Sequence, residues 1–147
     1  MSTRLLIHKA FLEGFNALNA LDKVIRESAI EKWHQELIKI SASHINGCAY
    51  CLDKHTNDAL LLDINPRKIA LIPVWREATN HFTEEEQIIL QLTEEVSLIH
   101  KEGISDEVYD ASIRLFGEGL TAQLIMAATV INAWNRIGVG LKMQPKF

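Results

Sequence analysis

Apolar residues recur at intervals of three and four along almost the whole of this sequence, the spacing of one buried face of an α-helix. The first such stretch runs from Phe15 to Ile25, and the next from Ala29 to Ile40. No segment alternates apolar and polar residues for long enough to make a sheet strand. The spacing therefore predicts an all-α fold, a bundle of about six to eight helices.

Capping residues and helix breakers mark the ends of the helices in the first half of the chain. Asn46-Gly47 interrupts the pattern, and we expect a helix over residues 48–61 to follow it. Asn65-Pro66 is typical of a helix start, with proline at the first helical position. Pro73 then ends or kinks that short helix.

The second half of the chain carries three further helix predictions. Thr83, with Glu86 three residues on, forms a capping box before an apolar run that we expect to end at Gly103. A second helix is expected over residues 105–115, and a long third one over residues 120–139. The third is apolar on several faces, which indicates a central position or a subunit interface.

Length and charge narrow the class of protein. At 147 residues the chain is most simply a single domain, residues 1–147. A net charge of −4, spread without a basic block, argues against nucleic-acid binding. No stretch approaches the ~20 apolar residues of a membrane span, and the N-terminus does not resemble a secretory signal. We therefore expect a cytoplasmic protein, in which paired cysteines serve catalysis or metal binding more often than structure.

The two cysteines of the chain, Cys48 and Cys51, are separated by two residues and follow Asn46-Gly47 directly. A thiol reacts as its thiolate, and the unpaired N–H groups at the start of a helix stabilise an anion. His55 lies four residues beyond Cys51, on the same face of the predicted helix, where it can accept a proton from the thiol. The segment is typical of a redox centre.

Glu36 and His44, on the preceding helix, are the other titratable candidates. Glu36 shares a helix face with apolar residues and is expected to be partly buried. A buried carboxylate beside a histidine orients that histidine as a base. The sequence thus suggests a relay from carboxylate to imidazole to thiolate.

Two other interpretations of these residues remain open. His44, Cys48, Cys51 and His55 have the residue types of a zinc site, but four ligands along one helical stretch would span roughly 16 Å. Zinc holds its ligands at ~2.0–2.3 Å from one point, so three at most could converge without another segment. The cysteines could also be a buried structural pair, since cysteine packs as a small hydrophobe.

With these residues assembled, the chain resembles the carboxymuconolactone decarboxylase and AhpD-like alkylhydroperoxidase superfamily. The core of the resemblance is a glutamate about a dozen residues before Cys-x-x-Cys and a histidine four residues after it, here Glu36, Cys48, Cys51 and His55. Similarity to the single-domain AhpD-like branch extends to residues 72–78, 82–84 and 131–136. It covers most of the chain from about residue 30 onward, with the motifs concentrated in residues 30–100.

The resemblance implies an all-α homo-oligomer, a trimer or hexamer, with peroxidase activity and no cofactor or metal. In the family, the second cysteine attacks the peroxide and becomes a sulfenic acid, and the first then condenses with it. Carried over, Cys51 is the peroxidatic residue, Cys48 the resolving residue, and His55 with Glu36 the proton relay. An external dithiol reductant would restore both thiols.

One position departs from the pattern. The best-known peroxidases of the family have a histidine before the second cysteine, where this chain has Tyr50. A tyrosine hydroxyl can donate a hydrogen bond but is a poor base at pH 7. His44 could compensate if its side chain points toward Cys48.

Two further functions compete with the peroxidase. The decarboxylase branch acts on lactones and generally lacks the paired cysteines. A non-enzymatic redox-sensing oligomer would need the same reactive pair. Asn132 and Asn135, which flank Trp134 on an apolar helix, suggest polar groups that pair across a subunit contact.

Overall fold

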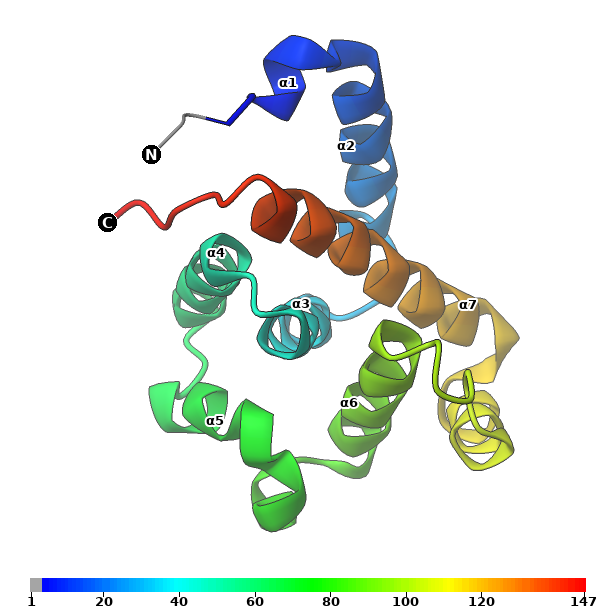
Figure 1. Cartoon of the computed structure of the whole chain (residues 1–147). Coiled ribbons are helices and arrows are strands. Elements are labelled where there is room, and N and C mark those ends of the chain that lie inside the picture. Colours follow the sequence, from blue (N-terminus) through cyan, green and yellow to red (C-terminus); the bar gives the residue numbers. More distant parts are fainter. Residues whose placement is uncertain (1–3) are drawn as a thin grey trace.

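The computed structural model describes residues 4–147, and over that range it consists of seven α-helices and two short 3₁₀ helices with no strand (Figure 1). In chain order the elements are α1 (Ile7–Ala10), α2 (Leu12–Arg26), α3 (Lys32–Asn46), α4 (Ala49–Leu61), α5 (Pro66–Leu71), η1 (Ile72–Glu77), η2 (Thr79–His81), α6 (Glu84–Ser97) and α7 (Asp106–Gly140). The predicted all-α fold is confirmed.

Helix α3 lies at the centre of the molecule. Every residue from His34 to Ser43 is buried, and the core side chains Leu37, Ile38 and Ile40 are at most 1% exposed. Figure 1 shows α3 almost end-on, with α4 on one side, α6 on the other and α7 running across them. A helix covered on several faces can carry polar residues only where partners satisfy them. The polar residues of α3 therefore point to specific contacts.

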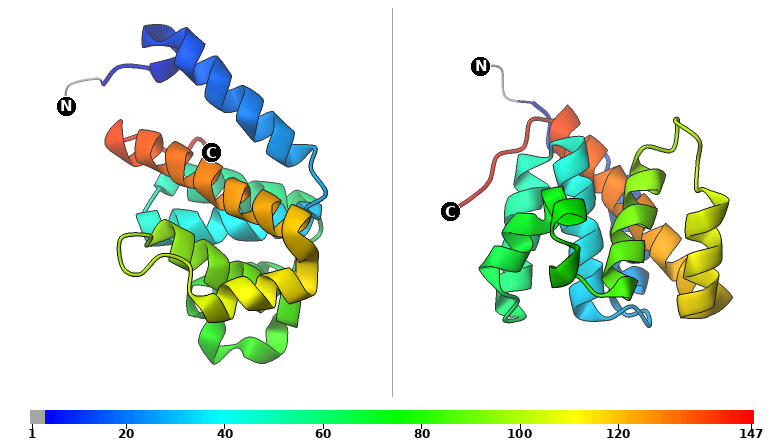
Figure 2. Two further views of the ribbon diagram at one scale, coloured as in Figure 1. Left: turned by 90° about the vertical axis from the view of Figure 1, so that its right-hand side faces the viewer. Right: turned by 90° about the horizontal axis from the view of Figure 1, so that it is seen from below.

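Helix α7 combines the last two predicted helices into one bent element. The predicted break is confirmed at Gly117, whose φ of 74° and ψ of 172° are not helical and kink the element between its two helical parts. Part of α7 is long and apolar enough to cross a membrane by length and composition. In the fold, however, α2, α3, α4 and α6 all pack against it (Figure 2). The helix is therefore a core helix of the bundle.

One predicted feature of the remaining helices differs from the structure. Helix α6 ends at Ser97, with Leu98 as its C-cap, so the predicted stop at Gly103 was wrong. Gly103 instead adopts a φ of 73° in the connection to α7. The starts of α5 and α6 are as predicted. Asn65 caps α5 through its side chain, and Thr83 and Glu86 form both bonds of the capping box at α6.

The N-terminal helices α1 and α2 lie along the outer side of α7 (Figure 2, left). Ile25 is the buried residue of α2, and Phe15 meets the edge of Trp134 with their ring centroids 5.7 Å apart. Several apolar side chains of this segment are more than half exposed: Leu5, Phe11, Leu12 and Val24. The segment thus leaves apolar surface uncovered in the single chain.

Candidate active site

The chain reverses direction between α3 and α4 through Gly47. Gly47 has a φ of 68°, a left-handed conformation that favours glycine, and its N–H donates to the carbonyl of His44. The N–H of Cys48 donates to the carbonyl of Ser43, which closes the end of α3. Because α4 begins at Ala49, Cys48 occupies its N-cap position.

Cys48 and Cys51 form a disulfide at this helix start. Their Cα atoms are 5.3 Å apart, and the two residues are only 2% and 5% exposed. The backbone N–H of Cys51 also donates to Sγ of Cys48, at 3.3 Å. The predicted placement of the cysteine pair at the N-terminus of a helix is confirmed.

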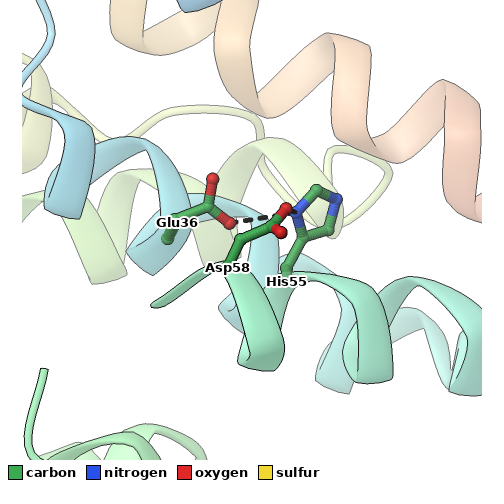
Figure 3. A group of neighbouring side chains, drawn as sticks. All are labelled: Glu36, His55 and Asp58. Atoms are coloured by element: carbon green, nitrogen blue, oxygen red, sulfur yellow. Dashed lines mark hydrogen bonds and ion pairs between the residues drawn. The ribbon is translucent and has the colours of Figure 1, made fainter. Parts of the chain in front are cut away.

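Glu36 and His55 meet across the interface of α3 and α4. Oε2 of Glu36 lies 3.0 Å from Nδ1 of His55, and both residues are 8% exposed (Figure 3). Asp58, one turn after His55, places Oδ2 at 3.6 Å from the same nitrogen. The carboxylate–imidazole pair expected from the sequence is therefore present, with Asp58 as a second carboxylate beside it.

A lysine accompanies each of these carboxylates. Nζ of Lys39 lies 3.4 Å from Oε1 of Glu36, and Nζ of Lys54 lies 2.8 Å from Oδ2 of Asp58. The lysines differ in their surroundings, since the Lys39 side chain is 9% exposed and that of Lys54 is 54% exposed. Each of the two carboxylates beside the imidazole of His55 therefore has a lysine as its partner.

The same cluster is the place where a metal ion would have to bind. The ligand atoms of Glu36, His55 and Asp58 all lie within 4.8 Å of one another. A divalent cation would have to displace the ammonium groups of Lys39 and Lys54 from the carboxylates, which makes this a poor cation site. In the disulfide form that the structure shows, the zinc site considered from the sequence, with His44, Cys48, Cys51 and His55 as ligands, is not assembled among residues 4–147.

His44 lies in the last turn of α3. It lines an open hollow of about 300 Å³ together with residues of η1 and α6, including Trp75, Arg76 and Glu94. Desolvation lowers the pKa of His44 below its usual value of 6.5. His44 is thus a residue of the hollow formed with η1 and α6, whereas the cysteines lie at the start of α4. Tyr50 is half-buried in the first turn of α4.

Gly138 of α7 completes the surroundings of the sulfurs. A Cβ atom built on Gly138 would lie 2.7 Å from Sγ of Cys48 and 3.3 Å from Sγ of Cys51. The backbone of α7 therefore lies directly against the disulfide, and only glycine permits that approach. Gly138 was not predicted from the sequence, since nothing local to it indicates which residues it contacts.

A buried polar cluster holds the turn before Cys48 in place. The side-chain amide of Asn46 donates to Oδ1 of Asn132, and Nδ2 of Asn132 donates to Oγ of Ser97. The amide of Asn135 lies 3.0 Å from Oγ of Ser43. These contacts join α3, α6 and α7 within one chain. The suggestion that Asn132 and Asn135 pair across a subunit contact was therefore wrong.

The fold and site define a class of protein: an all-helical bundle with a buried Cys-x-x-Cys at a helix start and a carboxylate–histidine pair nearby. The chain belongs to the carboxymuconolactone decarboxylase family, whose model matches residues 9–94, and to the AhpD-like superfamily. It is 32% identical over 141 residues to the uncharacterized protein YdfG of Bacillus subtilis strain 168, a match that covers 96% of this chain and 95% of that protein.

Two solved structures are similar in fold. One is a crystal structure from Agrobacterium tumefaciens, of a protein of unknown function described as a candidate antioxidant defence protein AhpD. It has a TM-score of 0.94, 34% sequence identity and coverage of 99% of both chains. The other, a peroxidase-related uncharacterized protein from Silicibacter sp. TM1040, has a TM-score of 0.79 and 22% identity, and covers 92% of this chain and 71% of that one. The second likeness shows the fold alone.

Proposed function

We propose that this protein is a thiol-dependent peroxidase, a dithiol–disulfide oxidoreductase that reduces hydroperoxides through Cys48 and Cys51. The observation that carries the proposal is the combination of a disulfide at a helix start with the Glu36–His55 pair at 3.0 Å on the same helix interface. Paired thiols with a nearby oriented base are what peroxide reduction requires.

The Glu36–His55 contact defines the direction of proton transfer. We assign the proton of the neutral imidazole to Nδ1, because an ionised carboxylate at Glu36 only accepts hydrogen bonds. Nε2 is then unprotonated and can act as a base. In Figure 3 this second ring nitrogen lies on the side of the imidazole away from the two carboxylates. His55 follows Cys51 by one helical turn, so we assign it the proton of that thiol.

The proposed reaction consumes one hydroperoxide and two thiols. The thiolate of Cys51 attacks the O–O bond, forming an S–O bond while the alcohol leaves with the proton held by His55. The thiol of Cys48 then attacks the sulfur of the Cys51 sulfenic acid, forming the disulfide as water leaves. The peroxide gains two electrons, which the two sulfurs lose.

An external dithiol closes the cycle by thiol–disulfide exchange, which returns two electrons and two protons to Cys48 and Cys51. Tyr50, next to Cys51, would contribute a hydrogen bond at most. The paired cysteines themselves favour this chemistry over the lactone chemistry of the decarboxylase branch, which needs no disulfide.

We propose that the protein works as a homo-oligomer, a trimer or hexamer, in the cytoplasm. The exposed apolar side chains of Leu5, Phe11 and Leu12 on the N-terminal segment support an association that covers them. A redox-sensing role without turnover is the alternative, and it would use the same cysteine pair.

A single-turnover experiment tests the proposal. The reduced protein is mixed with hydrogen peroxide or an organic hydroperoxide, and free thiols and the Cys48–Cys51 disulfide are followed in time. We expect one disulfide per peroxide consumed, at a rate far above that of an unstructured peptide thiol. Thiol loss no faster than in the peptide would reject the peroxidase function.

A further inference from the structure

Lys39 is an unusual residue for the interior of a helical bundle. Its side chain is 9% exposed, on the centre helix α3, although a lysine is seldom buried without a partner. Its Nζ lies 3.4 Å from Oε1 of Glu36, one turn earlier on the same helix. Burial of an ammonium group is costly, so the position calls for an explanation beyond packing.

The two oxygens of Glu36 are divided between two partners. Oε1 faces Lys39 at 3.4 Å, and Oε2 faces Nδ1 of His55 at 3.0 Å. The carboxylate thus bridges the lysine and the imidazole. The lysine therefore acts on His55 through Glu36.

Other charged groups near the cluster do not replace Lys39. On α4, Asp58 lies 3.6 Å from Nδ1 of His55 but is bound to Lys54. On α7, Arg136 donates to carbonyl and amide oxygens of its own helix. On the far side of α3, Arg76 of η1 pairs with α6. Among the ion pairs described for residues 4–147, the only lysine or arginine paired with Glu36 is Lys39.

We propose that Lys39 is a positioning residue, which holds Glu36 ionised and turned toward His55 so that the imidazole keeps its proton on Nδ1 and its Nε2 free as a base. A buried carboxylate without a cation tends to take up a proton or turn toward water. Either change removes the acceptor at Nδ1 and lets the proton move to Nε2, where it blocks the base. This inference rests on the proposed function for its consequence in catalysis, but its structural part can be measured separately.

The test uses the full chain with Lys39 replaced by methionine, which keeps the length of the side chain and removes its charge. Lys39→Gln is the second variant, for use if the methionine variant fails to fold. Its amide has no charge but can still donate a hydrogen bond to Glu36. Lys39→Arg retains the cation. Lys23→Met is the matched control, because Lys23 pairs with Glu27 on an exposed face of α2.

The first readout is the position of the proton on the neutral His55 ring, from nitrogen chemical shifts assigned with a His55→Gln variant. The second is the alkylation rate of the reduced cysteines with iodoacetamide as a function of pH. In the native protein and in Lys23→Met we expect the proton on Nδ1. In the uncharged Lys39 variants we expect population of the Nε2–H form and an alkylation rate at pH 7 lower by about fivefold, the effect of losing one hydrogen bond.

Lys39→Arg should retain the native tautomer and pH profile. Folded Lys39→Met or Lys39→Gln protein with the native tautomer and the native alkylation profile would overturn the proposal. A tautomer shift in a protein that consumes no hydroperoxide would support the positioning role and reject the peroxidase function, so the two failures can be told apart.

Discussion

Gly138 of α7 lies in direct contact with Cys48 of α4, so closely that a Cβ atom would stand 2.7 Å from the sulfur. We predict that Gly138→Ala destabilises the oxidised protein by about 1–3 kcal/mol, the usual cost of forcing one carbon into a packed interior. Urea unfolding of the disulfide form measures this. Gly119→Ala is the control, since no heavy atom would lie within 4 Å of its Cβ and alanine favours a helix. Equal stability of both variants would show that α7 can move away from the sulfurs.

The two cysteines should behave differently when replaced by serine. Cys51→Ser should lose hydroperoxide consumption completely, because the attacking sulfur is gone. Cys48→Ser should react once and retain a sulfenic acid on Cys51, detectable with dimedone by mass spectrometry. Sulfenic acid found on Cys48 in the Cys51→Ser protein would reverse the assigned roles.

Removal of the relay should slow thiol oxidation in a pH-dependent manner. We predict that His55→Ala lowers the rate of reaction with hydroperoxide at pH 7 by roughly 100-fold, within the range of a lost general base. Glu36→Gln should have a smaller effect, because it removes the group that orients the imidazole and leaves the base itself in place. Both rates should recover partly above pH 9, where a thiol ionises without help. If both variants react with hydroperoxide at the native rate at every pH, His55 and Glu36 are not part of the relay.

Glu86 should control the acid stability of the fold. Burial alone would raise the pKa of Glu86, but hydrogen bonds from Lys68, the N–H of Thr83 and the indole of Trp33 outweigh it and lower the pKa below the ordinary 4.5. A group whose pKa is lower in the folded state stabilises the protein fully above its unfolded pKa. That stabilisation is lost as the pH falls through the folded value, so unfolding should become easier below about pH 4.5.

Glu86→Gln should therefore lower the free energy of unfolding at pH 7 by about 1–3 kcal/mol and flatten its decline in acid. Chemical denaturation at several pH values checks both effects. Glu84→Gln is the matched control, since Glu84 pairs with Arg114 on the surface and should matter by about 0.5 kcal/mol. If the free energy of unfolding of the Glu86→Gln protein depends on pH as that of the native protein does, the role given to Glu86 is wrong.

The sequence predicted the helices well where local chemistry decides them. Gly47, Asn65 and Thr83 each act on the nearest turn of backbone, and each begins or ends a helix as expected. Gly117 also interrupts the helical backbone where a break was expected, whereas Gly103 was misjudged as the end of α6, because a glycine with positive φ fits a helix end or a loop equally well.

The site was predictable to the extent that its residues share a helix. The spacing of Cys48, Cys51 and His55 follows from α4 alone, and the same rule at three residues would have found Asp58 and, from Glu36, Lys39. Contact between Glu36 of α3 and His55 of α4 was suggested by their chemistry and was supported by the resemblance to a known family. Gly138 could not be found, because its contact with Cys48 joins residues 90 positions apart.

The most direct test of the account is catalytic turnover. Purified protein is supplied with excess hydroperoxide and a small dithiol, and hydroperoxide loss is measured beside Cys51→Ser protein at the same concentration. The account predicts that the native protein consumes many equivalents of hydroperoxide for each Cys48–Cys51 pair, while Cys51→Ser adds nothing to the reaction of the dithiol alone. Equal loss with the native and Cys51→Ser proteins would contradict a peroxidase centred on this pair.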